Sequence, residues 1–460
     1  MKNDIKIVLI GAGSRDFARR VVNDIVLEKE LVSAAGLHVV LVDIDEKRLK
    51  VMYNYARRVA EFKKSKVKFS AETDRKIALK GADFVITSVA VKRMELWEQD
   101  FRIPFSFGMK HVFGENGGPG ALFHALRNYN IIIPICRDIE RICPDATLIN
   151  FTNPEARILT AILKLTKVRA VGMCHGFYGL IHKVCQVLGR KSEELDIRSA
   201  GMNHFFTYYR ISDRKTGKDL RKEFEKRLAE KPELLGNDVS KHLFEKFGVV
   251  GIVSADHEGE YIGYAHELVE PRWLFGVENR KVFGWNRPIV AEDVYASWGS
   301  PHGFDVESFL KSEHCHYVDD YVTGKRKLDD KFVCPSGELA VPAIGDMVLD
   351  RKKWRNAVNV LNTGGYIANL AKDACVEVPA VFDKDGAHPE TIGELPEGFA
   401  AMIRRQNAIQ KLLVQAYAEK SKRLLLQALL LDPVVDSPSQ AEKCLDLMLR
   451  LQADYLPELK

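Results

Sequence analysis

The sequence predicts an α/β protein in which a doubly wound parallel sheet is followed by an α+β region. Apolar, strand-like segments alternate with helix-like segments over about the first 175 residues, the order typical of such a sheet. These strand-like segments are almost continuously apolar, as expected of parallel strands that are buried on both faces. Because 460 residues exceed the usual size of one core, we expect two parts, residues 1–195 and residues 196–460.

The first part contains five segments that read as strands, each followed by a turn or a helix. The strands are KIVLIGAGS (6–14), LHVVLVDID (37–45), ADFVITSVA (82–90), ATLINFTNP (146–154) and VRAVGMC (168–174). Amphipathic segments between them predict helices over residues 16–28, 46–62, 131–143 and 155–166.

The second part has a different texture. Residues 196–212 are rich in aromatic and β-branched side chains and predict paired strands, and charged helices follow over 218–231 and 239–247. A stretch interrupted by glycine and proline runs to about residue 340. The chain then predicts strands within 356–367 and 374–382, a long helical region over 399–433 and a last helix over 439–456.

Composition excludes several classes of function. The net charge of +5 is small for this length, and the basic cluster KKSKVK (63–68) fits a solvated face better than a nucleic-acid site. We find no apolar run of membrane-spanning length, and the first residues read as a strand rather than a signal peptide. Eight cysteines are scattered without the spacing of a disulfide framework, so we expect free thiols and a reducing cytoplasm.

A glycine turn ends the first predicted strand. Gly11, Gly13 and Ser14 stand where the strand should pass into a helix, and glycine lets the backbone approach a pyrophosphate. Asp43 ends the second strand, where a carboxylate can accept hydrogen bonds from an adenosine ribose and disfavours a 2′-phosphate. The third glycine of the fingerprint is missing. The sequence therefore predicts a Rossmann-type domain that binds NAD, with a plain structural turn as the alternative.

Two further loops carry polar groups at expected strand ends. GENGGPGALFHALRN (114–128) is dense in glycine and leads into a helix, so its backbone amides can come close to a ligand, although a surface loop has the same composition. NFTNP (150–154) places Asn153 at the carboxyl edge of the sheet, where doubly wound folds hold ligands. An Asn-Pro turn is also a common connection.

The segment VGMCHGFYG (171–179) puts Cys174 and His175 directly after a buried strand. Three interpretations compete: a metal site, a thiol nucleophile with its base, and local packing. His204 in GMNH (201–204) follows thirty residues later, and a cysteine with a histidine suits an open site for a soft to borderline divalent metal. The HCH triplet at 314–316 is read as structural, because adjacent helical residues point in different directions.

Taken together, these motifs resemble those of glycoside hydrolase family 4, the glycosidases that depend on NAD and a divalent metal. The matching stretches are IVLIGAGS, LVDID, GGPGALFHALRN, PDATLINFTNP, VGMCHG, GMNH, SADHEGEY and NVLNTGGYIANLAKDACVEVPAVF. A cysteine followed by histidine looks like the branch acting on unphosphorylated α-glycosides, which includes α-galactosidases, α-glucosidases and uronic-acid glycosidases. ADHEGEY is similar to the α-galactosidase members, whereas Glu115-Asn116 departs from the acidic-threonine pair of several relatives.

The resemblance implies hydrolysis by NAD-dependent oxidation at C3 of the sugar, proton abstraction at C2 and elimination, with a divalent metal. It implies that Cys174 and His204 ligate Mn²⁺ or a similar ion. His175 is the candidate for acid assistance or substrate contact. The thiol-nucleophile interpretation loses weight, since neighbouring strand residues point to opposite faces.

The resemblance also implies the remaining site residues. The base at C2 is expected among Asp256, His257 and Tyr261, with His257 the first choice because an ordinary imidazole titrates near neutrality. Asn153, Asn203 and Glu115 are expected to bind the glycoside, which is the only expected partner apart from further copies of the chain in a homodimer or homotetramer.

Two other functions stay open from the residues. A dehydrogenase of a small 2-hydroxy acid would use a similar lactate/malate dehydrogenase-like fold, and a sugar or nucleotide sensor would bind without catalysis. A dehydrogenase consumes NAD stoichiometrically, whereas the glycosidase needs only catalytic amounts of NAD.

Overall fold

The computed structural model describes residues 4–269 and 313–460. Its strands join in one sheet of 11 strands with the order β3-β2-β1-β4-β5-β6-β9-β10-β7-β8, and β11 pairs with β10. The strands are β1 (Asp4–Ile10), β2 (Gly36–Val42), β3 (Lys68–Glu72), β4 (Phe84–Thr87), β5 (Thr147–Asn150), β6 (Arg169–Met173), β7 (Leu195–Met202), β8 (Phe205–Asp213), β9 (Lys353–Leu361), β10 (Cys375–Asp383) and β11 (Gly386–Pro389).

The helices of the first part are α1 (Phe17–Leu27), α2 (Lys29–Ala34), α3 (Glu46–Phe62), α4 (Arg75–Leu79), α5 (Arg93–Ser106), α6 (Gly118–Ile142), α7 (Glu155–Leu165) and α8 (Phe177–Leu188). Those of the second part are α9 (Arg221–Glu230), α10 (Asp238–Phe247), α11 (Ala255–Gly259), α16 (Glu313–Thr323), α17 (Ala340–Val348), α18 (Glu397–Glu419), α19 (Lys422–Leu430) and α20 (Pro438–Leu451). The triplet 314–316 falls in α16, and its side chains lie outside the described part.

The six strands from β3 to β6 are all parallel, in the order 3-2-1-4-5-6 of a doubly wound dinucleotide-binding sheet. Alternate residues of β1 enter different cores: Ile7 and Leu9 pack with α1 and α3, and Val8 and Ile10 pack with α6. Helices therefore cover both faces, and the predicted fold class is confirmed. The edge strand β3 was not predicted.

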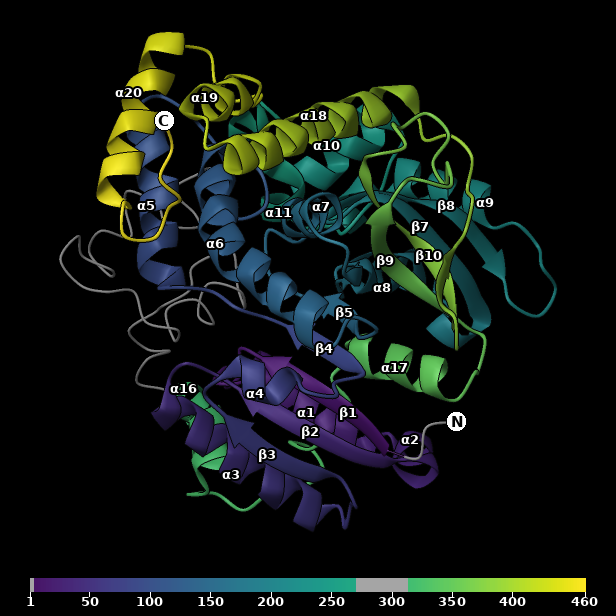
Figure 1. Cartoon of the computed structure of the whole chain (residues 1–460). Helices are drawn as coiled ribbons and strands as arrows, with labels where there is room; N and C mark the ends of the chain where they lie inside the picture. Colours follow the sequence, from purple (N-terminus) through teal and green to yellow (C-terminus); the bar gives the residue numbers. More distant parts are fainter. Residues whose placement is uncertain (1–3, 270–312) are drawn as a thin grey trace.

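The remaining strands continue the same sheet in antiparallel fashion. Strand β9 pairs with β6 through Gly172↔Asn359, β10 pairs with β9 and with β7, and β7 pairs with β8. Figure 1 shows the parallel strands β1–β3 in the lower half, with α18, α19 and α20 across the upper side near α5 and α6. Strands from before and after residue 195 therefore belong to one sheet.

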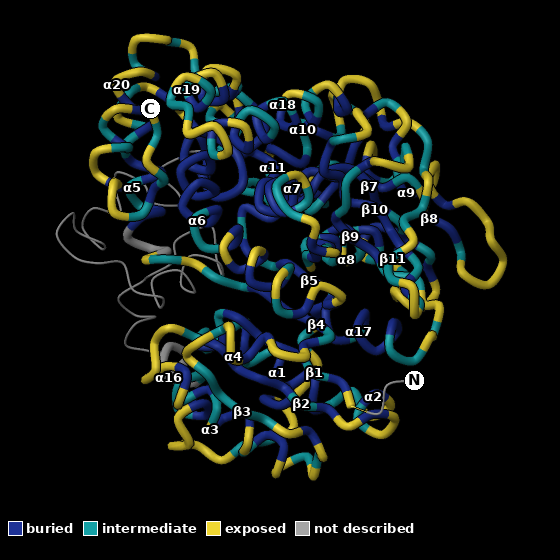
Figure 2. The backbone as a smooth tube through the Cα atoms, viewed as in Figure 1, coloured by how far each residue is buried: buried dark blue, intermediate teal, exposed yellow. Residues whose placement is uncertain are grey.

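Burial follows the sheet. The inner strands and the helices α6 and α7 are largely dark blue in Figure 2, whereas the edge strand β3 is mostly intermediate and exposed residues collect in the turns and on the outer faces of α3 and α20. Helix α6 is buried along most of its length because it lies between the parallel sheet and α18–α19. Among residues 4–269 and 313–460, no helix combines the length and apolar character needed to cross a membrane.

Candidate active site

The glycine turn that follows β1 lies against the carboxyl ends of β4 and β2. A Cβ atom at Gly11, whose φ is +93°, would stand 2.0 Å from the carbonyl oxygen of Ser88. A Cβ atom at Gly13 would stand 2.7 Å from Asp43 Oδ2. Gly11 therefore excludes a side chain, and a side chain at Gly13 would displace the Asp43 carboxylate. The Ser14 hydroxyl accepts a hydrogen bond from the amide of Phe17, the first residue of α1.

Asp43 braces this turn. Its Oδ2 accepts the Gly13 amide at 2.7 Å, and its Oδ1 accepts the Asp45 amide at 2.9 Å. Ile44, the next residue, exposes 95% of its surface. The carboxylate thus fixes the geometry of the loop.

Cys174 and His204 meet at the carboxyl end of β6. The Cys174 Sγ and His204 Nε2 atoms are 3.3 Å apart. Two ligands at about 2.3 Å (sulfur) and 2.1 Å (nitrogen) from one ion, at an angle near 90–110°, stand roughly 3.1–3.6 Å apart. The pair therefore has the spacing of two ligands of a single divalent ion.

Local backbone geometry brings His204 to this point. Asn203 and His204 form the two-residue connection of the β7–β8 hairpin, and His204 has a φ of +62°. Burial lowers the pKa of His204 well below its ordinary value, and nearby imidazoles add to the shift. Burial raises the pKa of Cys174, and the charge of Glu377 raises it further. Without an ion, the pair is a neutral thiol beside a neutral imidazole.

Other ligand atoms converge on His204. One ligand atom each of His204, His257 and Glu260 lie within 4.8 Å of one another, and the His204 and His257 rings have centroids 4.3 Å apart. His204 Nδ1, His257 Nδ1 and Glu260 Oε2 are buried without a hydrogen-bond partner in the described part. His257 Nδ1 and Glu260 Oε2 lie 4.0 Å apart as a buried ion pair. Because His204 Nε2 faces Cys174 and an imidazole binds an ion through one nitrogen, His257 and Glu260 are further donor groups near the Cys174–His204 pair.

Neighbouring carboxylates determine the protonation state of His257. Burial alone would lower the pKa of His257, but the carboxylates of Asp256 and Glu260 outweigh burial and raise it to about 9. In the metal-free protein, His257 is therefore an imidazolium beside Glu260. It can act as a base only after that proton has left.

The glycine-rich loop before α6 packs on the same segment. Glu260 Oε1 accepts the amides of Glu115 and Asn116 at 2.5 and 2.8 Å. The buried Glu115 side chain accepts a hydrogen bond from Asn153 Nδ2 at 3.1 Å. The loop is thus an ordered, buried wall of the site, contrary to the surface-loop alternative.

Asp256 and Tyr261 are placed differently from His257. Asp256 Oδ1 accepts the Ser254 hydroxyl and the His257 amide, at the start of α11. The Tyr261 hydroxyl donates to the carbonyl oxygen of Asn203 at 3.3 Å, and burial raises its pKa well above the ordinary value. Tyr261 therefore braces the hairpin turn that carries His204.

Two asparagines share one buried carboxylate. Glu377 Oε2 accepts hydrogen bonds from Asn203 Nδ2 at 3.0 Å and from Asn359 Nδ2 at 3.1 Å. The buried Glu155 side chain lies against Gly172, where a Cβ atom would stand 1.4 Å from Glu155 Oε1. Asn203 Oδ1 is buried without a partner in the described part, so it is available to a ligand.

His175 points to a different neighbour. Its Nδ1 is 2.8 Å from Glu338 Oε1, and its side chain is 54% exposed. The structure therefore brings together the predicted residues Cys174, His204, His257, Glu115, Asn153 and Asn203, partly through Glu260 and Glu377, whereas the side chain of His175 contacts Glu338.

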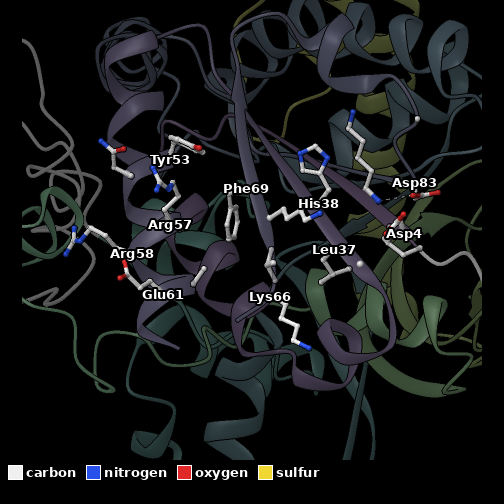
Figure 3. Close-up of a pocket in the computed structure, with 18 of the residues that line it drawn as sticks. Asp4, Leu37, His38, Tyr53, Arg57, Arg58, Glu61, Lys66, Phe69 and Asp83 are labelled. Atoms are coloured by element: carbon white, nitrogen blue, oxygen red, sulfur yellow. Dashed lines mark hydrogen bonds between the residues drawn. The ribbon is translucent and has the colours of Figure 1, made fainter. Parts of the chain in front are cut away.

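A separate cavity in the described part lies away from these residues. It measures about 1440 Å³ and is lined by the amino ends of β1–β3, by α3 and by the loop before β3 (Figure 3). His38, Lys66 and Asp83 line it, and no predicted site residue does. Doubly wound sheets bind ligands at the carboxyl edge of their strands. We therefore place the candidate active site at the edge that carries Cys174 and His204, and not in this cavity.

Sequence reasoning missed three acidic residues. Glu260 stands three residues after His257, a spacing that puts both on one side of a helical turn, so this signal was available. Glu377 is a lone acid inside an apolar strand, which also signals a role. Glu338 had no sequence signal, since its loop is fixed only by tertiary contacts.

The fold and site define a Rossmann-type α/β enzyme with a thiol, imidazoles and carboxylates gathered at the carboxyl edge of its sheet. A model of the family 4 glycosyl hydrolases matches residues 6–190, and a model of their C-terminal domain matches residues 199–435. The chain belongs to family 4 of the glycosyl hydrolases, and the resemblance seen in its motifs is confirmed. It is a glycosidase.

Individual relatives extend over the whole chain. An α-glucosidase of Erwinia rhapontici is 30% identical, and an α-galactosidase of Bacillus subtilis (strain 168) is 29% identical; each alignment covers 99% of this chain, and 99% and 100% of the relative. A 6-phospho-α-glucosidase from gut microorganisms, solved in complex with NAD and Mn²⁺, has a TM-score of 0.77 at 22% identity, covering 99% of this chain and 100% of that chain. Plasmodium falciparum malate dehydrogenase shares the fold more distantly, with a TM-score of 0.51 at 12% identity over 90% and 99% of the two chains.

Proposed function

We propose that this glycosidase hydrolyses an unphosphorylated α-glycoside, with an α-galactoside as the first choice, and that it uses NAD and Mn²⁺ or another divalent metal. The observation that carries the proposal is the 3.3 Å approach of Cys174 Sγ to His204 Nε2 at the sheet edge that also carries the glycine turn. The names of the α-glucosidase and α-galactosidase relatives support the substrate class.

The residues present fit both groups. The turn at Gly11 and Gly13 leaves backbone close to the start of α1, as a pyrophosphate requires, and Asp43 would accept the ribose. Cys174 and His204 would hold the metal. When bound, NAD⁺ accepts and returns a hydride at C3 of the sugar, and the divalent ion polarises the neighbouring sugar oxygens.

The chain itself would bind the sugar and move protons. Asn153, Asn203 and Glu115 offer amide and carboxylate atoms to the sugar hydroxyls, and Asn203 Oδ1 is already desolvated and unpaired in the described part. Burial of this wall excludes water, which strengthens each of these contacts.

Proton transfer at C2 falls to the segment 256–261, which contains the three candidate bases. His257 is the first candidate, because its Nδ1 is buried and lies among the atoms that converge on His204. Asp256 and Tyr261 remain candidates, although both already bind neighbouring groups. His175 would assist the leaving oxygen at C1 from its half-exposed position.

A panel of 4-nitrophenyl α-glycosides tests the proposal. The galactoside, glucoside, galacturonide and glucuronide are each assayed with NAD⁺, Mn²⁺ and a thiol reductant, and the 6-phosphorylated glucoside serves as the comparison. We expect the unphosphorylated galactoside to be hydrolysed. Hydrolysis that needs catalytic NAD⁺ and exchanges the C2 hydrogen with solvent deuterium supports the mechanism. NAD⁺ consumed one for one indicates a 2-hydroxy-acid dehydrogenase, and binding without exchange indicates a sensor.

We further propose a cytoplasmic homodimer or homotetramer. Every cysteine whose side chain is described is a free thiol, which is compatible with a reducing compartment. Light scattering of the purified protein measures the oligomeric state, and a monomeric mass contradicts this proposal.

A further inference from the structure

The buried carboxylate of Glu338 contacts the half-exposed imidazole of His175. Glu338 Oε1 is 2.8 Å from His175 Nδ1, and the Glu338 side chain is only 4% exposed. Its second oxygen, Oε2, is buried and has no hydrogen-bond partner in the described part. Within residues 4–269 and 313–460, the polar contact of this carboxylate is therefore directed to His175.

The position of Glu338 is fixed from the dinucleotide-type half of the molecule. The Glu338 amide donates to the Ser336 hydroxyl oxygen at 3.0 Å. The Ser336 amide in turn donates to Asp24 Oδ1 at 2.8 Å, and the Ser336 hydroxyl donates to Asp24 Oδ2. Asp24 belongs to α1, the helix that follows the glycine turn, and α17 begins two residues after Glu338. Contacts on both sides of the loop thus hold the carboxylate in place.

The contact has a chemical consequence for the imidazole. A carboxylate without a proton only accepts hydrogen bonds, so the Nδ1 atom of His175 must carry the hydrogen. Nε2 is then the nitrogen left for a substrate, and the ring cannot rotate without breaking the contact. Carboxylate partners fix the tautomer and orientation of functional histidines in this way.

We propose that Glu338 is a positioning residue that accepts the Nδ1 hydrogen of His175 and so turns Nε2 toward the glycosidic oxygen at C1. As the imidazolium, His175 would give its Nε2 proton to the departing oxygen and be left as the neutral Nδ1–H ring that Glu338 favours. This inference rests on the proposed function, in which His175 assists the leaving group. Glu338 touches neither sugar nor cofactor in this account and acts only through His175. Its loss therefore affects the departure of the aglycone and leaves exchange at C2 unchanged.

The tautomer tests the positioning directly and does not depend on activity. In full-length, metal-free protein labelled with ¹⁵N-histidine, long-range proton–nitrogen spectra distinguish Nδ1–H from Nε2–H rings, and the His175 signals are those lost in His175→Gln. We expect Nδ1–H in the wild type and a shift to Nε2–H, the form that free imidazole favours, in Glu338→Ala. Glu338→Gln, whose amide oxygen can still accept, should retain Nδ1–H. An unchanged tautomer in Glu338→Ala overturns the proposal.

Kinetics test the consequence. With methyl α-galactoside, a poor leaving group, Glu338→Ala should lower kcat about tenfold more than with 4-nitrophenyl α-galactoside. Deuterium exchange at C2 should stay within about twofold, and Glu338→Ala should add nothing in a His175→Ala background. Equal losses on both substrates, or a further loss in that background, overturn the inference. A wild type that cleaves no glycoside refutes the proposed function instead, and the tautomer still decides the role of Glu338.

Discussion

The shifted pKa of Glu377 predicts how the unfolding free energy of the protein changes with pH. Burial raises the pKa of Glu377 to about 7, even though hydrogen bonds from Asn203 and Asn359 favour its charged form. In the unfolded chain this carboxyl titrates near 4.5. The folded protein therefore binds this proton more tightly. The stabilisation is complete below pH 4.5 and is lost as pH rises to about 7.

The size of the loss follows from the shift. Each pKa unit corresponds to about 1.4 kcal/mol, so roughly 2.5 units correspond to about 3 kcal/mol between pH 4.5 and 7. Glu377→Gln is neutral at every pH, and its amide oxygen can accept from both asparagines. We expect this variant to match the wild type near pH 4.5 and to exceed its unfolding free energy by up to about 3 kcal/mol at pH 8. Removing this charge also relieves Glu155, whose pKa is raised by burial and by Glu377, so both effects have the same sign.

Urea unfolding of protein without metal or NAD, measured from pH 5 to pH 8 in EDTA, provides the assay. Glu442→Gln, an exposed change on α20, is the matched control and should follow the wild type throughout. The informative quantity is the difference between Glu377→Gln and wild type at each pH. A difference that stays constant from pH 5 to pH 8 refutes the assignment of a shifted proton to Glu377.

Three further predictions follow from single contacts. Gly172→Ala should destabilise the protein by about 1–3 kcal/mol, because its Cβ atom would collide with Glu155; a melting temperature equal to wild type contradicts this. Asp43→Asn loses one of two charge-assisted acceptors and should weaken NAD binding at least about tenfold in a fluorescence titration, and unchanged affinity contradicts the bracing role. Cys174→Ser should lower Mn²⁺ affinity about tenfold or more by calorimetry, whereas Cys185→Ser, away from the site, should leave it unchanged.

Much of the parallel half was predictable, because its strands carry their own signal. The apolar segments at 6–14 and 37–45 overlap β1 and β2, and those at 82–90, 146–154 and 168–174 contain β4, β5 and β6. Strand β3 (Lys68–Glu72) was missed because it is a short edge strand without an apolar run. The antiparallel order β9-β10-β7-β8 was not predictable, since β9 joins β6 across more than 170 residues of chain and no local pattern specifies that register.

Some residues of the candidate site were predictable from the sequence and others were not. Cys174 was found because it directly follows a predicted strand, and His204 was found because the motif GMNH follows thirty residues later. Their contact is now seen. The roles assigned to the site residues stay predictions, as does the division of the chain at residue 195. Glu338 was not predicted because its place beside His175 depends on tertiary contacts. Its loop is held by Ser336 and by Asp24 of α1, which lie far apart in the sequence.

One polar row across the sheet explains why the site lies where its two halves join. Gly172, Asn359, Glu377 and Gly201 are successive cross-strand partners on β6, β9, β10 and β7. The chain leaves this row two residues before Cys174 on one side and two residues before Asn203 on the other. Burying an acid here costs free energy that an apolar row would not. Glu377 is the acid of this row, and a cation held by the nearby thiol and imidazole would favour its charged form. The cost of burying Glu377 is therefore explained as electrostatic preparation for a divalent ion.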